Sequence, residues 1–274
     1  MAATLTLEAL ERIAALVKKR IGVTLEAGKL QRMRRKIEGV MHKHGYEDFH
    51  AFYHALRFKH DEALIQELLN AVTINETYFW REHEQFEICC QKLLPEYVAQ
   101  KGADEKIRFL VAPCSSGEEL YSIMIALSEE KTILERTPVE MVGIDIDSSM
   151  IEKAKRGLYT RRSVERLPAH LQQKYFTQVG DYYRILPEFT EVATFLVANI
   201  FDETLPDRLG QFDFLFSRNM LIYFNHEEKR RCFDQLYKLL KPGGYLFLGH
   251  ADSNGIDKTR FQPLGLGSPI YRKV

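Results

Sequence analysis

The sequence predicts an α/β fold in which a parallel β-sheet is covered by helices on both faces and preceded by a small all-α region. After Arg108, short runs rich in Val, Ile, Leu and Phe alternate with helical segments, as is typical of a buried parallel sheet. Before Val72, apolar residues recur every three or four positions and no strand pattern is evident. A chain of 274 residues is long for one domain and short for three, so one mid-sized and one small domain are expected.

The expected strands are the five apolar runs at residues 107–111, 139–146, 193–200, 212–216 and 245–248. Helical patterns separate them at residues 118–130, 148–156 and 226–240. The turn-forming sequence Lys241-Pro242-Gly243-Gly244 is expected to end the last of these helices.

Composition and charge exclude several classes of protein. No apolar run approaches the roughly 20 residues that would span a bilayer, and the first 20 residues lack the pattern of a signal peptide, so we expect a cytoplasmic protein. The four cysteines show no paired spacing, so neither a disulfide framework nor a metal site is indicated. The net charge is zero, yet residues 1–44 hold ten Lys or Arg against four Asp or Glu. This segregation favours an acidic partner for the N-terminal region.

Polar residues follow the expected strands at the edge where open parallel sheets bind ligands. The first strand is followed by a small-residue segment, Ala112-Pro113-Cys114-Ser115-Ser116-Gly117-Glu118-Glu119, in which Ser115 or Ser116 should cap the next helix. Small side chains let a ligand approach the backbone closely. The segment has one glycine and two acidic residues, so it does not match the dinucleotide-binding pattern and favours a ligand without phosphates.

The next strand ends favour a nucleoside. Asp145 lies at the end of the second strand, where nucleotide-binding sheets hold the ribose hydroxyls. Asn199 and Ile200 end the third strand, and Arg218 and Asn219 lie at the end of the fourth; they offer groups for an adenine edge and an amino-acid moiety. Together these groups match S-adenosylmethionine. Alternatively, each Asp or Asn could simply cap a helix or turn. The presence of such residues at successive strand ends makes this alternative weaker.

Five sequence stretches resemble the CheR family of methyltransferases, and the resemblance covers nearly the whole chain. They are Thr73-Ile74-Asn75-Glu76-Thr77-Tyr78-Phe79-Trp80-Arg81-Glu82, Ser115-Ser116-Gly117-Glu118-Glu119-Leu120-Tyr121-Ser122, Asp145-Ile146-Asp147, the segment from Phe212-Asp213 to Arg218-Asn219-Met220-Leu221-Ile222-Tyr223-Phe224, and the segment from Leu239-Leu240-Lys241-Pro242-Gly243-Gly244 to Gly249-His250. The departures, at Ile74, Trp80 and Leu120, remove no polar contact that the pattern implies.

The resemblance implies a Rossmann-like class I methyltransferase sheet with a short inserted β-subdomain and a small N-terminal all-α domain. The implied units are an N-terminal receptor-docking domain (1–72), a connector with cofactor and substrate residues (73–90) and the domain that binds S-adenosylmethionine (91–274). Cofactor contacts are implied at Asn75, Thr77, Arg81, Glu119, Asp145, Asn199, Ile200, Arg218 and Asn219. Of the two adjacent acids Glu118 and Glu119, the alignment favours Glu119.

The implied reaction is methyl transfer from S-adenosylmethionine to glutamate side chains of chemoreceptors, with S-adenosylhomocysteine as the product. A glutamate of pKa about 4.3 is ionised at pH 7, so the nucleophile needs no general base. The resemblance assigns orientation of the substrate carboxylate to Arg81 and packing beside the methyl group to Tyr223. Tyr223 could instead be a core aromatic. The segment from Tyr175 to Tyr183 is shorter than the hairpin of family members that bind a receptor C-terminal pentapeptide. The sequence therefore does not decide whether this chain binds such a peptide.

A basic stripe on the N-terminal region is the expected docking face for the receptor. On a helical wheel, Lys29, Arg32, Lys36 and Lys43 share one side, opposite Leu30, Ile37 and Met41. Such a stripe is often only a solvated face. Nucleic acid is disfavoured as a partner by the zero net charge, and a monomer is expected. Two alternatives remain: a methyltransferase of the same fold for another substrate class, and a non-catalytic module that binds S-adenosylmethionine.

Overall fold

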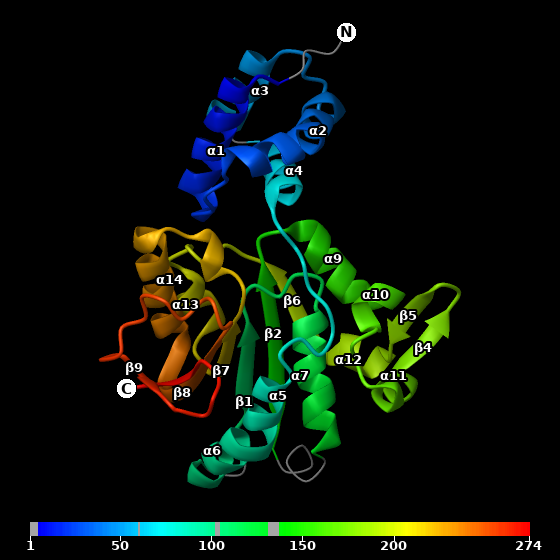
Figure 1. Cartoon of the computed structure of the whole chain (residues 1–274), viewed down its shortest axis with the longest axis vertical. Helices are drawn as coiled ribbons and strands as arrows, with labels where there is room; N and C mark the ends of the chain where they lie inside the picture. The colour runs from blue at the N-terminus through cyan, green and yellow to red at the C-terminus, as the bar shows by residue number, and fades with distance from the viewer. Residues whose placement is uncertain (1–4, 60, 102–104, 131–136) are drawn as a thin grey trace.

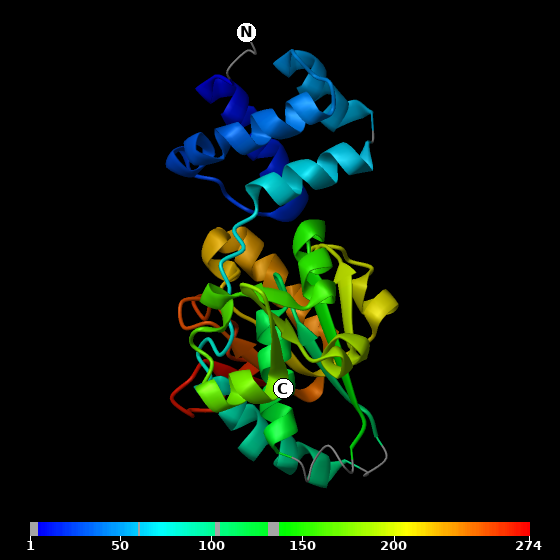
Figure 2. The same cartoon turned by 90° about the vertical axis from the view of Figure 1, so that its right-hand side faces the viewer.

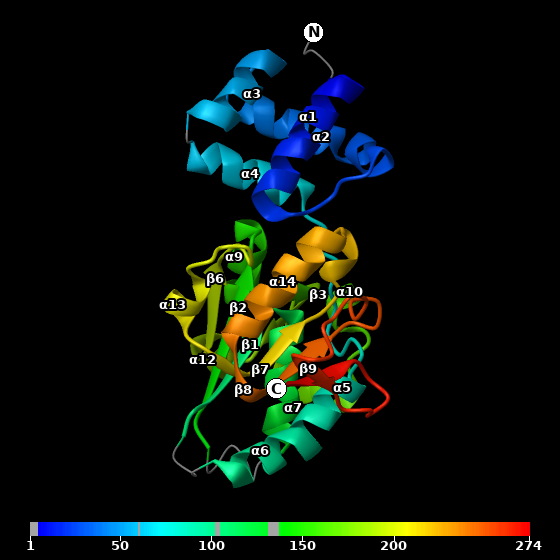
Figure 3. The same cartoon turned by 90° about the vertical axis from the view of Figure 1, so that its left-hand side faces the viewer.

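The computed structural model describes residues 5–59, 61–101, 105–130 and 137–274. A helical N-terminal bundle stands above a larger α/β part, joined to it by the extended segment that leaves α4 (Figure 1). The turned views show the bundle on the same end of the sheet (Figures 2 and 3). The chain therefore has the all-α region followed by the α/β region that the sequence predicts.

The N-terminal bundle consists of α1 (Leu7–Ile21), α2 (Ala27–Lys43), α3 (Phe49–Phe58) and α4 (Glu62–Val72). Helix α1 begins where the Thr6 hydroxyl accepts a hydrogen bond from the Ala9 backbone N–H, and it ends at Gly22. Gly22 has φ 70°, and a Cβ there would lie 2.5 Å from the Phe201 ring. The apolar faces of these helices, including Leu10, Ile37 and Leu68, form a core of their own.

The helices of the α/β part lie before the first strand and between later ones. They are α5 (Glu84–Glu87), the π-helix η1 (Ile88–Leu93), α6 (Leu94–Gln100), α7 (Glu118–Glu129), α9 (Ser148–Arg156), α10 (Arg161–Val164), α11 (Ala169–Tyr175), α12 (Pro187–Val192), α13 (Leu205–Leu209), the 3-10 helix η2 (Leu221–Tyr223) and α14 (His226–Leu239). Helix α14 begins with a capping box formed by Asn225 and Glu228.

Within the described residues the main sheet has seven strands in the order β6-β2-β1-β7-β8-β10-β9. They are β1 (Ile107–Val111), β2 (Val139–Asp145), β6 (Ala193–Val197), β7 (Phe212–Ser217), β8 (Leu240–Leu248), β9 (Phe261–Pro263) and β10 (Ile270–Lys273). β6, β2, β1, β7 and β8 are parallel, and β10 is antiparallel to both of its neighbours. A second, antiparallel sheet consists of β3 (Leu158–Thr160), β4 (Phe176–Val179) and β5 (Tyr182–Ile185). This sheet is the inserted β-subdomain, and it lies beside the main sheet (Figure 1).

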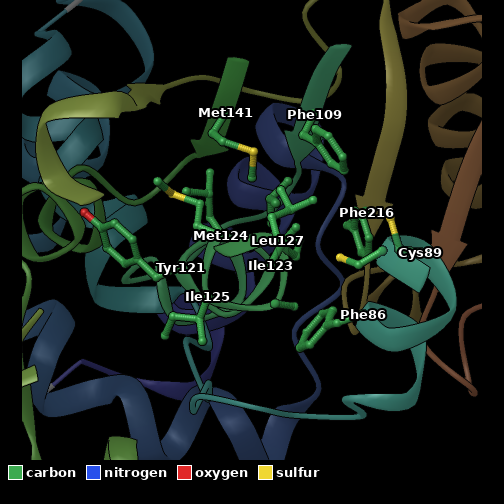
Figure 4. Packing of buried hydrophobic residues seen from close by; sticks show 14 of the residues in the cluster. Phe86, Cys89, Phe109, Tyr121, Ile123, Met124, Ile125, Leu127, Met141 and Phe216 are labelled. Carbon is green, nitrogen blue, oxygen red and sulfur yellow. The ribbon is translucent and has the colours of Figure 1, made fainter. Parts of the chain in front are cut away.

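Alternate residues of the buried strands pack on opposite faces of the sheet. Phe109 and Phe216 belong to the core shared with α7, and Figure 4 shows Ile123, Met124 and Leu127 of that helix in the same core. Their strand neighbours Leu110 and Leu215 belong instead to the core under α13 and α14. The sheet is thus covered on both faces, as expected from its almost wholly apolar strands.

Three local expectations differ from the structure. The sequence Lys241-Pro242-Gly243-Gly244 lies inside β8, at an irregularity in its pairing with β7, and a Cβ on Gly244 would come 2.8 Å from the Asp213 carbonyl oxygen. Gly117, with φ 91°, is the N-cap of α7, so the expected serine cap was wrong; Ser116 Oγ donates to the Glu118 carboxylate instead. The short strands β9 and β10 were not expected, because their runs are brief.

The bundle rests directly on the loops that follow the parallel strands. From α4, the Gln66 side chain donates to the Ile146 carbonyl oxygen at 2.7 Å, and the Asn70 side chain donates to Ser148 Oγ at 2.9 Å. On the other side, the Asn199 side chain donates to the Arg20 carbonyl oxygen at 2.8 Å. The bundle is therefore placed over the edge of the sheet where ligands of this fold bind.

A buried carboxylate, Asp213, should make a large contribution to stability. It is fully buried and accepts hydrogen bonds from Tyr97 Oη (2.7 Å), Lys101 Nζ (2.6 Å), Lys241 Nζ (2.9 Å) and the Arg108 N–H (2.8 Å). Burial alone would raise its pKa, but the hydrogen bonds from the lysines lower it below the ordinary value. Its stabilisation is therefore present above the unfolded-state pKa and is lost as the pH falls through the lower folded pKa.

We expect Asp213→Ala to reduce the free energy of unfolding by about 3 kcal/mol, because two lysines lose a buried partner. Denaturant unfolding measures this change. Ligand binding at the carboxyl ends of the parallel strands should stay unchanged, since Asp213 lies near the start of β7. Asp207→Ala, an exposed change on α13, is the control. Equal stabilities of the two variants would contradict the expectation.

Candidate functional site

A cavity of about 1050 Å³, counting its open mouth, lies where the strand order of the sheet reverses. The chain proceeds from β1 to β2 and β6 on one side, then returns to β7 on the other side of β1. Open α/β sheets bind ligands at such a switch point. The cavity is lined by all nine residues of the expected cofactor set, Asn75, Thr77, Arg81, Glu119, Asp145, Asn199, Ile200, Arg218 and Asn219, and by Tyr223.

Asp145, at the end of β2, is buried and held by two backbone donors. Its Oδ2 accepts from the Ser115 N–H at 2.7 Å, and its Oδ1 accepts from the Asp147 N–H at 2.9 Å. Burial raises the pKa of Asp145 to about 6, although both hydrogen bonds oppose the shift. A carboxylate offers about four lone-pair sites, so two remain for hydroxyl donors.

The two acids at the start of α7 have different surroundings. Glu119 lines the cavity, and its Oε2 lies 3.2 Å from Arg218 Nη1. Burial raises the pKa of Glu119, and the positive charge of Arg218 opposes that shift. Glu118 does not line the cavity; its carboxylate accepts from the Ser116 hydroxyl, and burial raises its pKa to about 7. The structure thus places Glu119, the residue favoured by the alignment, at the cavity.

The connector brings Asn75, Thr77 and Arg81 to the cavity. It is anchored by Asp147 Oδ2, which accepts from Asn75 Nδ2 at 2.6 Å and from Thr73 Oγ1 at 2.7 Å. Arg81 Nη1 donates to the Glu76 carbonyl oxygen at 3.3 Å. Among the described residues, no carboxylate lies within ion-pair distance of Arg81. Its guanidinium therefore remains available to a carboxylate that enters the cavity.

On the far side, two asparagines follow β6 and β7. The Asn199 side chain is occupied, because its Nδ2 donates to Arg20 and its Oδ1 accepts from the Phe201 N–H. Asn219 has φ 58°, and its N–H donates to the Asp252 carboxylate. The Asp252 carboxylate also accepts from the Ile222 N–H at 3.1 Å. Asp252 thereby fixes the loop that carries both Asn219 and Tyr223.

Tyr223 stands between the cavity and the N-terminal bundle. The Lys29 ammonium of α2 lies 4.7 Å from the centre of the Tyr223 ring, within the range of a cation–π contact. The Thr24 N–H donates to the Tyr223 carbonyl oxygen at 3.2 Å. Burial raises the pKa of the Tyr223 phenol, so the hydroxyl stays protonated at neutral pH.

Comparison with known families identifies both parts of the chain. Residues 75–268 match the CheR methyltransferase SAM binding domain, and residues 8–73 match the CheR methyltransferase all-alpha domain. The chain belongs to the CheR methyltransferase family. Its cofactor is therefore S-adenosylmethionine.

Several relatives are similar over most of their length. A chemotaxis protein methyltransferase 2 of Vibrio cholerae is 36% identical and covers 81% of this chain and 76% of its own, and a chemotaxis protein methyltransferase 1 of Pseudomonas aeruginosa is 32% identical and covers 89% of both chains. A probable biofilm formation methyltransferase, WspC, of Pseudomonas putida is 30% identical and covers 93% of this chain but 59% of its own. A solved class I methyltransferase of Listeria monocytogenes superposes with a TM-score of 0.41 at 15% identity, covering 98% of this chain and 86% of its own.

The CheR cavity has the chemistry that S-adenosylmethionine requires. Among the described residues, the buried atoms Glu119 Oε1 and Arg218 Nη1 make no hydrogen bond, so the cavity wall offers an acceptor and a donor beside the Glu119–Arg218 ion pair. These groups suit the ammonium and carboxylate of an amino-acid moiety, and Asp145 suits ribose hydroxyls. We therefore retain the nine lining residues as the proposed cofactor contacts.

Asp145→Ala should weaken S-adenosylhomocysteine binding by about 100-fold or more, because each of the two hydroxyl hydrogen bonds to the carboxylate contributes roughly 1.5 to 3 kcal/mol. Calorimetry on the folded variant measures the loss. In the parent, affinity should also fall as the pH drops below about 6, since protonation removes an acceptor. Asp145→Asn should lack this pH dependence. Unchanged affinity in the alanine variant would reject the ribose assignment.

The expected docking stripe lies on α2, but its four members have different surroundings. Arg32 and Lys36 are exposed, and no ion pair within the described part of the chain involves them. Lys43 pairs with Glu67 of α4 at 2.8 Å, a contact that lowers the pKa of Glu67. Lys29 contacts Tyr223, as described above. Arg32 and Lys36 are therefore the members most available to an acidic partner.

Sequence reasoning missed two carboxylates that hold the site together. Asp147 belongs to the stretch Asp145-Ile146-Asp147, but the sequence pattern assigns it no role. In the structure it anchors Thr73 and Asn75 of the connector. Asp252 was not singled out, although it is fully buried and fixes the Asn219–Tyr223 loop. The position of Asp252 soon after the last parallel strand was the one available signal.

Proposed function

We propose that this CheR family member methylates glutamate side chains of chemoreceptors, producing glutamate methyl esters. The family and the cofactor establish methyl transfer from S-adenosylmethionine. The names of the Vibrio and Pseudomonas relatives support a role in chemotaxis. The contact between Lys29 and Tyr223 carries the proposal, because it joins the basic helix α2 to the mouth of the cofactor cavity.

The proposed substrate carboxylate needs orientation rather than activation. The cofactor supplies a methyl group made electrophilic by the adjacent sulfonium. A glutamate with a pKa of about 4.3 is already ionised at neutral pH, and no histidine is among the described residues that line the cavity. Arg81, which has no carboxylate partner in the described chain, is proposed to bind the incoming carboxylate. The protonated Tyr223 hydroxyl is proposed to lie beside it and limit its approach to one direction.

Arg32 and Lys36 on α2 are proposed to dock an acidic helical surface of the receptor. Their charges sum to a local positive field on a neutral chain, and such a field mainly speeds encounter. No helix in the described part of the chain is long and apolar enough to span a bilayer. We propose that the protein acts in the cytoplasm as a monomer on the cytoplasmic parts of the receptors.

Transfer of labelled methyl from S-adenosylmethionine to receptor-containing membranes tests the proposed function. We expect label on the receptor that is released by mild base, because an ester hydrolyses and an N-methyl group does not. Base-stable label, or label only on small molecules or nucleic acid, would indicate another substrate class. Cofactor binding without any transfer would indicate a non-catalytic module. Either result contradicts the proposal.

A further inference from the structure

Three charged side chains form a cluster at the cavity wall. Arg218, whose side chain is 0% exposed, lies between two carboxylates: its Nη1 is 3.2 Å from Glu119 Oε2, and its Nη2 is 3.2 Å from Glu82 Oε2. Glu119 and Arg218 line the cavity, whereas Glu82 does not. Glu82 is therefore one residue removed from any ligand there.

The cluster is short of positive charge. Two carboxylates and one guanidinium sum to −1. Among the described residues, Glu119 Oε1 and Glu82 Oε2 accept no hydrogen bond, although Glu82 Oε2 lies within ion-pair distance of Arg218. Arg218 Nε and Nη1 also lack an acceptor at hydrogen-bond geometry, so neither ion pair satisfies the guanidinium fully. Because unpaired buried charge is costly, the cluster favours a cationic group in the adjoining cavity.

Glu82 is held in this position by an unusual backbone. Trp80 and Glu82 have φ 66° and 51°, in the left-handed region that side chains other than glycine rarely adopt. Arg218 Nη2 donates to the Arg81 carbonyl oxygen at 2.7 Å, so the same guanidinium holds the backbone between these residues. The Trp80 N–H donates to Ser122 Oγ at 3.0 Å. The strained turn is thus fixed at both ends, with the Glu82 carboxylate directed to Arg218.

We propose that Glu82 is a positioning residue for the cofactor's ammonium group. By sharing Arg218, Glu82 prevents Glu119 from being fully neutralised in a one-to-one ion pair, and Glu119 retains an oxygen that can accept hydrogen bonds from the ammonium. The inference concerns the established cofactor and does not depend on which substrate receives the methyl group.

Three ligands separate this electrostatic role from a purely structural one. S-adenosylmethionine carries a sulfonium, an ammonium and a carboxylate, with a net charge of +1. S-adenosylhomocysteine keeps the ammonium and carboxylate but loses the sulfonium charge. Methylthioadenosine has the nucleoside and the sulfur but no amino-acid moiety. If Glu82 acts through the charge of the cluster, its removal must affect these ligands in that order.

The variant Glu82→Gln removes the charge and keeps the side-chain size. We expect its affinity for S-adenosylmethionine to fall about tenfold and its affinity for S-adenosylhomocysteine about threefold, since the loss of one negative charge is felt at the ammonium of both ligands and also at the sulfonium of the first. Methylthioadenosine affinity should be unchanged. Glu84→Gln, two residues along and exposed, is the matched control and should leave all three affinities unchanged.

Calorimetry of the three ligands on both variants decides the matter, with the melting temperature recorded for each. Equal loss for all three ligands would mean that Glu82 only maintains the Trp80–Glu82 turn, and no loss would mean that Glu119 binds without its help; either result overturns the proposal. Should Glu82→Gln fail to fold, Glu82→Asp keeps the charge but withdraws it from Arg218. In that variant, the affinity for S-adenosylmethionine should fall about threefold relative to the affinity for methylthioadenosine. An unchanged ratio of these two affinities would likewise overturn the proposal.

Discussion

Replacing Arg81 with alanine should lower the rate of methyl transfer by about 100-fold or more while leaving the fold intact. Misplacing one reactant can cost roughly this factor, because most of the catalytic effect expected here comes from orientation. Arg81 is partly exposed, and its side chain makes only one hydrogen bond among the described contacts, at 3.3 Å to the Glu76 carbonyl oxygen. The melting temperature should therefore change by no more than about 2 °C.

The comparison of kcat with S-adenosylhomocysteine affinity distinguishes the roles proposed for Arg81. Because the guanidinium also lines the cofactor cavity, affinity for the product should fall modestly, by less than the loss in kcat. Arg81→Lys keeps the charge but not the planar pair of donors, so it should recover only part of the rate. Arg184→Ala, an exposed arginine on β5, serves as the control. A variant that loses fold and activity together would show that Arg81 is structural.

The fold was predictable because its strands are buried on both faces. The run Phe212–Ser217 is buried at every position, so apart from Asp213 and the terminal Ser217 its residues are apolar and do not alternate with polar ones. The strands β9 and β10 were missed because they are only three and four residues long. The N-cap of α7 was missed because the left-handed turn at Ser115 and Gly117 takes the place of a serine cap.

The lining of the cavity was predictable from the sequence, but the hydrogen bonds of the lining residues were not. Residues after successive parallel strands meet at one edge of the sheet, so Asp145, Asn199 and Arg218 could be assigned to one cavity from their positions. Which of their polar atoms are already used depends on distant segments. The Asn199 side-chain amide donates to the carbonyl oxygen of Arg20, 179 positions away in the sequence, and no local sequence pattern predicts such a contact.

The α2 stripe illustrates the same limit. Periodicity placed four basic residues on one side of the helix, but it could not reveal that Lys43 pairs with Glu67 or that Lys29 lies over Tyr223. The stripe is therefore composed of residues with three different environments. A test of docking should use Arg32 and Lys36, because changing Lys29 would also disturb the cavity mouth.

The double variant Arg32→Glu with Lys36→Glu should lower receptor methylation strongly, by about tenfold or more at low ionic strength. Electrostatic steering can raise association rates by this factor and more, and the reversal changes the local charge by four units. Both residues are exposed, and exposed charges contribute only about 0.2 to 1 kcal/mol each to stability, so the fold should survive. Added salt should reduce the difference in methylation rate between variant and parent, because it screens the attraction between the basic residues of the parent and the receptor.

The matched control is Lys92→Glu with Lys258→Glu, which makes the same change of net charge at exposed positions outside the bundle. S-adenosylhomocysteine affinity should be equal in the parent and both double variants, since none of the four residues lines the cavity. Initial rates of methyl transfer to receptor membranes, measured at several salt concentrations, give the result. If the α2 variant and the control slow methylation equally, net charge alone is responsible and α2 is not the docking face. If neither slows it, the stripe is an ordinary solvated surface, and the receptor must approach the Tyr223 side of the cavity without it.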